Sequence, residues 1–200
     1  MTRTSTARAA NAGRRGFTTV LESEFPHGGR VLNLGAGLVS WARDTTTVVN
    51  VDHVPGPRHP AACQVVADAG HLPFRAGSFT GVLAKDVLEH LVDPVPALAL
   101  LHDVTAPGAM LIATVPRAVP RAVWDDPTHV RGFTANAVRT AMGLSGWRVR
   151  TLGRIGGFPG AGRLGLTPYL ELIMKVPGFG HRFGTNWLVR AQRIDEGPGG

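Results

Sequence analysis

The sequence predicts an α/β protein with a doubly wound sheet, and three observations support this prediction. Short apolar or β-branched runs alternate with segments of helical periodicity along most of the chain. One run leads directly into the Gly-x-Gly turn of Gly35 and Gly37, and the next run ends in an acid, Asp52. A third run, residues 109–115, is almost entirely apolar, as expected for a strand buried on both faces of a sheet.

Seven segments are expected to be strands, because each is short, rich in apolar residues and bounded by turn-forming residues. They are residues 30–34, 47–51, 62–67, 79–84, 109–115, 147–152 and 187–193. Cys63 falls in the third of these strands and is expected to be a buried small hydrophobic residue. As the single cysteine it excludes an internal disulfide framework, which is typical of a reducing compartment and predicts a cytoplasmic protein.

Six segments are expected to be helical: residues 17–25, 38–43, 87–91, 95–104, 135–144 and 168–175. Pro94 lies at the beginning of the fourth segment, where proline is tolerated, and Pro107 and Gly108 stop it. Thr134 is expected to cap the fifth segment. Residues 116–132 form a loop about three times the usual length of a connection, which indicates a functional loop.

The length of 200 residues suits one domain, expected to span residues 16–193. Residues 1–15 are basic and expected to be a disordered tail, with a transit peptide as the alternative, and residues 194–200 a flexible tail. The formal net charge is +7, but the arginines are dispersed and no basic run alternates with aromatic residues. Nucleic-acid binding is therefore not favoured. No apolar run reaches the roughly 18 residues of a membrane span.

The glycine turn and the acid after it predict a site for a nucleoside-containing cofactor. Glycine has no Cβ and allows backbone to approach a ligand closely, whereas an acid at a strand tip can accept hydrogen bonds from a ribose diol. Val39 and Ser40 stand where a third glycine is common, which argues against a dinucleotide. Asp68 closes the third strand and is expected to accept from an adenine amino group. For both acids, an ordinary cap on the following turn is the alternative.

Two further groups of polar residues follow the fourth and fifth strands. Glu89 and His90 either act on the substrate or cap and orient a short helix. Asp126, His129 and Arg131 lie in the long loop and are expected to contact the substrate, the alternative being a solvated loop held by an Asp–Arg pair. No metal site is expected there, because no second histidine or cysteine stands at ligand spacing.

The chain resembles the class I S-adenosylmethionine-dependent methyltransferases, in particular their small-molecule, methyltransferase type 11-like branch. The resemblance covers residues 28–152 and is weaker towards the end. VLNLGAG resembles the first motif of the family and NVD its acidic strand end. ADAGHLPFRAGSFTGVLAKDVLEHL is the most specific match, and LLHDVTAPGAMLIATVP resembles the helix, turn and fifth strand. DPTHVRGFT resembles a loop that lies over the substrate side in one subgroup.

The resemblance implies a seven-stranded Rossmann-like methyltransferase sheet, whose last strand, residues 187–193, is antiparallel and inserted near the sixth. It implies S-adenosylmethionine as the cofactor and S-adenosylhomocysteine as the product. In this reading the glycine turn approaches the methionine moiety, Asp52 holds the ribose, and Asp68 with Ala69 reads the adenine. The expected cofactor-binding residues are Asn33, Gly35, Ala36, Gly37, Asp52, His53, Asp68, Ala69, Lys85 and Asp86. The chain departs from the family pattern at Asn33 and Thr80, where an acid is usual, and at Ala36.

The expected function is in-line methyl transfer to a small-molecule acceptor, such as a secondary metabolite or a lipid-linked molecule. His129 is the first candidate for a general base and His90 the second. Residues 116–132 and 153–183 are expected to form the acceptor pocket and its cover. The apolar segment 166–176 is expected to pack on the core, with contact to a membrane surface as the alternative. The sequence predicts no particular oligomeric state.

Two other classes of function compete with small-molecule methylation. A non-catalytic S-adenosylmethionine-binding or scaffold protein is suggested by the changes at Asn33 and Thr80. A nucleic-acid methyltransferase is suggested by the high pI and disfavoured by Lys85-Asp86-Val87-Leu88. Enzymes that methylate exocyclic amines of bases carry an Asn/Asp-Pro-Pro-aromatic motif at this position.

Overall fold

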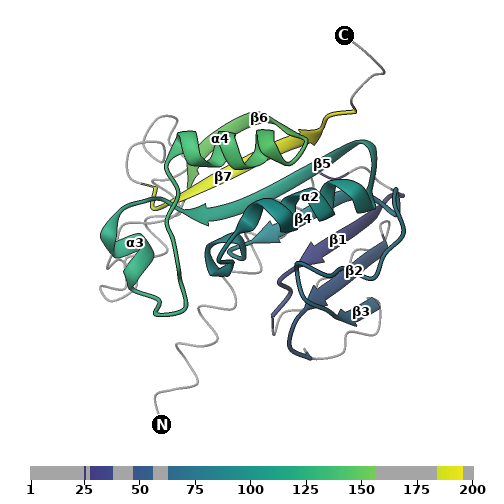
Figure 1. Ribbon diagram of the computed structural model, residues 1–200, viewed down its shortest axis with the longest axis horizontal. Helices are drawn as coiled ribbons and strands as arrows, with labels where there is room; N and C mark the ends of the chain where they lie inside the picture. The colour runs from purple at the N-terminus through teal and green to yellow at the C-terminus, as the bar shows by residue number, and fades with distance from the viewer. Residues whose placement is uncertain (1–24, 26–27, 38–46, 56–62, 156–183, 196–200) are drawn as a thin grey trace.

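The computed structural model describes residue 25 and residues 28–37, 47–55, 63–155 and 184–195. These residues form a seven-stranded sheet with the order β3-β2-β1-β4-β5-β7-β6 (Figure 1). Its strands are β1 (Arg30–Leu34), β2 (Thr47–Asp52), β3 (Cys63–Val66), β4 (Phe79–Lys85), β5 (Thr105–Pro116), β6 (Trp147–Ile155) and β7 (Asn186–Arg193). The helices of the described part are η1 (Leu88–His90, a 3₁₀ helix), α2 (Pro94–Val104), α3 (Pro120–Trp124) and α4 (Ala135–Leu144).

Strands β1 to β5 pair in parallel, and β7 lies between β5 and β6, antiparallel to both. The predicted sheet, with its antiparallel last strand inserted next to the sixth, is confirmed. Parallel pairing of β1 with β2 and β4 brings the carboxyl ends of these three strands to one edge of the sheet. In folds of this class, ligands bind outside that edge.

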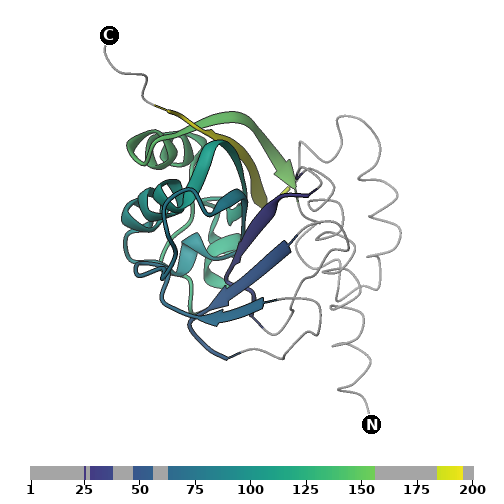
Figure 2. The same cartoon turned by 90° about the vertical axis from the view of Figure 1, so that its right-hand side faces the viewer.

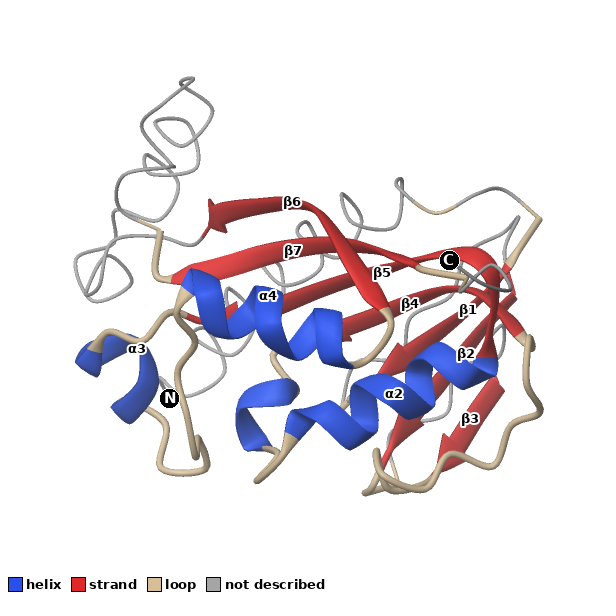
Figure 3. Cartoon of the chain, turned by 45° about the horizontal axis from the view of Figure 1, so that its top comes forward, coloured by secondary structure: helices blue, strands red, loops and turns tan. Residues whose placement is uncertain are grey.

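Helices α2 and α4 cover one face of the sheet (Figures 2 and 3). Side chains alternate between the two faces along each strand, so Leu32 packs in the core under these helices and Val31 in a second core on the opposite face. In the described part of the chain, Phe25 is the residue outside the sheet that joins this second core. The expected helical segments 38–43 and 168–175, and all of 17–25 except Phe25, lie outside the described residues. So do the tail 1–15, residues 196–200 of the expected tail 194–200, and residues 156–183 of the expected substrate cover 153–183.

The expected helix boundaries are close to those observed, and the Thr134 cap is confirmed. Thr134 Oγ1 accepts a hydrogen bond from the backbone N–H of Ala137 at 3.1 Å, and α4 covers the expected residues. The side chain of Asp93, which was not expected to cap, accepts from the N–H of Val95 and begins α2. Residues 87–91 were expected to be helical and contain the 3₁₀ helix η1. None of the helices described is long and apolar enough to cross a membrane.

Several sequence-based boundaries were wrong because tertiary pairing extends the strands. β5 begins at Thr105 rather than at residue 109, since Thr105 pairs with Phe79 of β4. β6 continues to Ile155, which pairs with Asn186 of β7. The loop expected over residues 116–132 contains α3, which begins at Pro120. Proline in the first turn of a helix loses no intrahelical hydrogen bond.

The expectation that Cys63 is buried was also wrong. Cys63 is exposed at the first position of β3, which is the edge strand of the sheet and pairs only with β2 in the described part of the chain. An edge strand has one neighbouring strand and less cover from the layers packed on the sheet. Sequence periodicity identifies a strand but not its place in the sheet.

One buried polar pair lies in the middle of the sheet. Asn33 of β1 and Asn50 of β2 stand opposite one another, and Asn33 Nδ2 donates to Asn50 Oδ1 at 2.7 Å. Both residues are buried, so the hydrogen bond satisfies groups that would otherwise be costly to remove from water. The unusual Asn33 therefore has a structural partner within the core.

Replacing Asn33 with Leu should destabilise the fold by about 1–3 kcal/mol, because it removes the donor to buried Asn50 at nearly constant volume. The free energy of unfolding from urea titration measures this effect. Thr80→Val is the control: Thr80 is exposed, its hydroxyl donates to the Arg30 carbonyl, and its change should stay within about 0.5 kcal/mol. Equal stability of the two variants would contradict a structural role for the asparagine pair.

Candidate active site

The turn after β1 brings backbone close to a neighbouring loop. Gly35 and Gly37 have φ angles of 66° and 58°, in the left-handed region that glycine adopts without steric cost. A Cβ on Gly35 would lie 2.2 Å from Val87 Cγ2, so no other residue fits between the turn and η1 without movement. The sequence motif therefore reflects both a backbone conformation and a close contact.

Asp52, at the end of β2, is tied to this turn. Its Oδ2 accepts from the N–H of Gly37 at 2.7 Å, and its Oδ1 accepts from the N–H of Val54 at 3.0 Å. His53 Nδ1 lies 3.1 Å from Oδ1, and the Asp52 side chain is 15% exposed. Each carboxylate oxygen can accept more than one hydrogen bond, so Asp52 can hold the turn and still accept from a diol.

Asp86 follows β4 in a strained conformation. Its φ angle is 52°, the only positive value among the non-glycine residues described. Its N–H donates to the carbonyl oxygen of Thr114 at 3.1 Å, and its Oδ1 accepts from Thr114 Oγ1 at 2.7 Å and from Asn186 Nδ2 at 3.3 Å. Lys85 Nζ lies 3.5 Å from Oδ2. Backbone strain of this kind persists where surrounding contacts hold it, and it is common at functional sites.

These strand ends surround a cleft with a volume of about 590 Å³. Six of the expected cofactor-binding residues line it: Gly35, Asp52, His53, Asp68, Ala69 and Asp86. Ala36 and Gly37 line a smaller neighbouring cavity together with Asp52, whereas Asn33 is buried in the sheet and Lys85 is absent from both linings. Asp68 Oδ1 also accepts from the N–H of Gly70 at 2.7 Å, which is the turn expected as the alternative for this acid.

The long loop after β5 packs against η1 and completes one side of the cleft. The N–H of Val130 donates to the carbonyl oxygen of Glu89 at 3.0 Å. Asp126 Oδ1 accepts from both the N–H and the hydroxyl of Thr128, at 2.9 and 2.6 Å. Thr128 and His90 are both in the lining of the cleft, whereas Arg131 Nη2 donates to the carbonyl oxygen of Val92.

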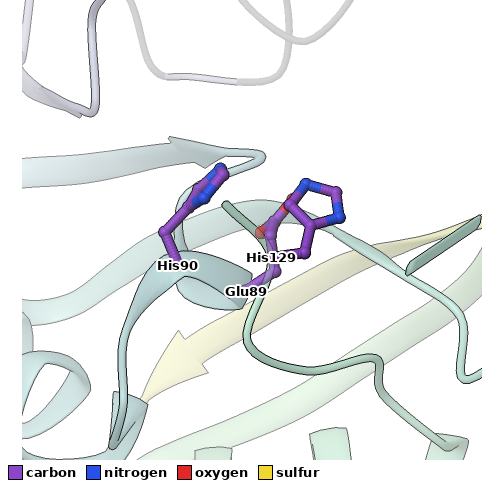
Figure 4. A group of neighbouring side chains, drawn as sticks. All are labelled: Glu89, His90 and His129. Atoms are coloured by element: carbon purple, nitrogen blue, oxygen red, sulfur yellow. The ribbon is translucent and has the colours of Figure 1, made fainter. Parts of the chain in front are cut away.

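Glu89, His90 and His129 come together at this junction (Figure 4). The rings of His90 and His129 are 4.9 Å apart between centroids. His129 Nε2 lies 3.8 Å from Glu89 Oε1 and 3.9 Å from Asp126 Oδ2. The structure thus brings together the two histidines that the sequence suggested separately as bases, and buried Glu89 lies beside them.

The two carboxylates of this junction have opposite environments. The pKa of Glu89 is raised to about 8, chiefly by burial and to a smaller extent by the charges of Asp86 and Asp126, against an opposing backbone hydrogen bond. The hydrogen bonds from Thr128 lower the pKa of Asp126. Glu89 therefore holds a proton at neutral pH whereas Asp126 is ionised, a separation that is typical of functional sites.

Sequence reasoning left Glu89 open between acting on the substrate and capping a helix, and it did not select Thr114 or Thr128. The spacing of Asp86, Glu89 and His90 was a usable signal, since it places all three within one turn after a strand end. The contact of this turn with Thr128, which lies 38 residues beyond His90, had no sequence signal. It depends on how the loop after β5 folds back over η1.

The described residues fit the cofactor that the resemblance implied. A cleft of about 590 Å³ lies within the roughly 300–1,000 Å³ of small-molecule sites. Its glycine turn permits close approach, and its acids at Asp52, Asp68 and Asp86 are suitable for a ligand with hydroxyl, amino and cationic sulfonium groups. The protein's own groups thus supply acceptors where such a ligand carries donors or positive charge.

Comparison with known proteins agrees with this fold. Residues 32–113 match the model of a methyltransferase domain, and no curated protein matches the chain. A methyltransferase solved with the Trm112 methyltransferase activator of Haloferax volcanii has a TM-score of 0.67 and 17% identity, over 94% of this chain and 95% of that one.

Two further solved structures share the fold. An S-adenosylmethionine-dependent methyltransferase of Mesorhizobium loti has a TM-score of 0.65 and 17% identity, over 88% of this chain and 96% of that one. The [4+2]-cyclase SpnF has a TM-score of 0.61 and 17% identity, over 89% of this chain and 80% of that one. The family match covers the glycine turn, the acid of β2 and the strained turn after β4, so residues 32–113 form a methyltransferase domain, and the sheet order agrees with the fold of these solved structures.

Proposed function

We propose that this enzyme methylates a small-molecule acceptor. The composition of the cleft carries the proposal: among the described residues its lining contains three aspartates and neither lysine nor arginine. Proteins that bind nucleic acid neutralise its phosphates with basic side chains. An acidic cleft carries the same charge as the phosphates and would repel them. An acidic cleft is better suited to a small neutral or cationic acceptor, even though the whole chain has a net charge of +7.

We assign the strand ends to the cofactor. Asp52 accepts from the ribose hydroxyls, Asp68 and Ala69 contact the adenine, and Gly35 approaches the methionine moiety with Asp86 beside it. These roles are supported by the common lining of one cleft. When bound, S-adenosylmethionine supplies a methyl group on a sulfonium that is already activated for displacement, so the protein mainly has to align the acceptor.

The acceptor lies, in this proposal, towards His90 and Thr128 on the opposite wall of the cleft. His90 Nδ1 contacts the carbonyl oxygen of Thr128 at 3.2 Å and its hydroxyl oxygen at 3.1 Å. That hydroxyl donates its single proton to Asp126, so both oxygens act as acceptors and Nδ1 must be the donor. His90 Nε2 is then the nitrogen with a lone pair, able to receive a proton from the acceptor.

His129 stands behind His90, and its tautomer follows in the same way. Its Nδ1 lies 2.9 Å from the carbonyl oxygen of Val123, which can only accept, so Nε2 carries the lone pair of the neutral ring. Nε2 faces Glu89 and Asp126. We propose that the two imidazoles take up the acceptor proton together, while Asp126 and Arg131 hold the loop. The single free cysteine, which is exposed, supports a reducing, cytoplasmic location.

Replacing Asp52 with Ala should weaken binding of S-adenosylmethionine at least about tenfold, because a charged hydrogen-bond acceptor is lost from the cleft. Calorimetric titration with S-adenosylmethionine and S-adenosylhomocysteine measures this. Asp103→Ala, which removes an exposed acid at the end of α2, is the matched control and should bind as the original chain does. Unchanged affinity in a folded Asp52→Ala variant would rule out the assigned ribose contact.

Incubation with methyl-labelled S-adenosylmethionine should transfer label to the small-molecule fraction of a cell extract. Separate reactions with RNA, DNA and protein fractions test the alternatives, and the Asp52→Ala variant serves as the inactive control. We expect no label in nucleic acid, because the described lining of the cleft is acidic. Label in RNA or DNA above that control would replace the small-molecule proposal with a nucleic-acid one.

Replacing His129 with Ala should reduce turnover at least about tenfold while changing cofactor affinity less than about twofold, since His129 is absent from the lining of the cleft. Steady-state kinetics with the acceptor identified above and calorimetry separate the two quantities. Asp103→Ala, which removes an exposed acid at the end of α2, is the control and should retain full turnover. A normal rate in His129→Ala would show that this imidazole takes no part in the reaction.

A further inference from the structure

The junction of η1 and the loop after β5 holds a group that the fold alone does not explain. The Glu89 side chain is 1% exposed, and its Oε2 has no hydrogen-bond partner among the residues that the structure describes. Its other oxygen faces His129 Nε2 at 3.8 Å, which is too long for a hydrogen bond. A buried carboxyl oxygen without a hydrogen-bond partner is costly, so its retention needs a reason.

The two imidazoles beside Glu89 are prepared as ligands. Each has its Nδ1 engaged with oxygen acceptors, Thr128 for His90 and the Val123 carbonyl for His129. This leaves Nε2 with the lone pair in both neutral rings. Metal-binding histidines are oriented in this way, with one nitrogen donating to an oxygen and the other binding the ion. In His129 that second nitrogen points to two carboxylates at 3.8 and 3.9 Å, an arrangement that a cation between them would complete.

We propose that Glu89, His90 and His129 bind a divalent transition-metal ion. Each residue offers one ligand atom, and these atoms lie within 4.8 Å of one another. Zinc bonds of about 2.0–2.1 Å would bring tetrahedral ligand atoms to about 3.3–3.4 Å, so the cluster has to contract by about 1.4 Å or less. His90 is exposed, and its side chain is the one most able to make this movement.

The chemistry of the donors selects the kind of ion. Two imidazole nitrogens and the carboxylate that Glu89 forms when it releases its proton to solvent favour zinc, iron or cobalt over magnesium and calcium, which prefer oxygen ligands. The carboxylate of Asp126, 3.9 Å from His129 Nε2, adds negative charge next to the three ligands. Three protein ligands also leave a coordination position open, as in catalytic rather than structural zinc sites.

One consequence rests on the proposed function. His90 lines the cleft, so an acceptor oxygen in the cleft can take the open position, and a metal ion makes its O–H proton easier to remove. The proton then leaves to solvent, the new carbon–oxygen bond forms, and the carbon–sulfur bond breaks. In this arrangement His90 and His129 act as ligands rather than as bases.

Metal binding can be measured on the full chain without cofactor or acceptor, so its failure is separate from failure of methyl transfer. Protein freed of metal with a chelator is titrated with Zn²⁺ by calorimetry and with Co²⁺ by visible absorption. We expect one equivalent to bind, with the absorption bands of cobalt bound to nitrogen and oxygen, and much weaker binding of Mg²⁺. Binding should also raise the melting temperature.

Variants identify the ligands. His90→Ala, His129→Ala and Glu89→Gln should each weaken Zn²⁺ binding at least about tenfold. His90 is exposed, so His90→Ala should fold normally. It keeps the test decisive if the variant of buried Glu89 does not fold. The chain has eight histidines, and His71 is an exposed one. His71→Ala therefore controls for adventitious binding of Zn²⁺ by surface histidines. No Zn²⁺ or Co²⁺ binding by the original chain, or equal binding by His90→Ala and His71→Ala, would overturn the proposal.

Discussion

Parallel pairing of β1 with both β2 and β4 is the constraint on which the rest of this structure depends. It places Gly35, Asp52 and Asp86 at one edge of the sheet, although they are far apart in the sequence. The buried Asn33–Asn50 hydrogen bond lies between two of these strands and helps to fix their alignment. A shift of one residue would turn each apolar side chain to the opposite face.

The turns at this edge are held by hydrogen bonds from one strand end to another. Asp52 accepts from Gly37 in the turn after β1, and Asp86 exchanges hydrogen bonds with Thr114 of β5. The same acids line the cleft, so they both hold the turns and form part of its wall. A site built in this way is rigid before its ligand arrives, which reduces the entropy lost on binding.

The opposite wall of the cleft is organised differently. It is formed where the loop after β5 meets η1, through contacts of Thr128 with His90 and of Val130 with Glu89. Burial of Glu89 beside two imidazoles concentrates titratable groups at this wall, whereas the wall at the strand ends is formed by backbone amides and acids. One edge of the sheet therefore combines turns that are fixed by hydrogen bonds with a wall of titratable groups.

The sequence by itself determined the sheet, most of its strands, the α4 cap and the glycine turn with Asp52, because these depend on local periodicity and on residues next to each strand. It did not determine the exposure of Cys63 or the length of β5 and β6, which depend on a strand's neighbours in the sheet. Nor did it determine that His90 and His129 would meet over Glu89. That contact joins segments far apart along the chain, and it exists only because the loop after β5 folds back over η1.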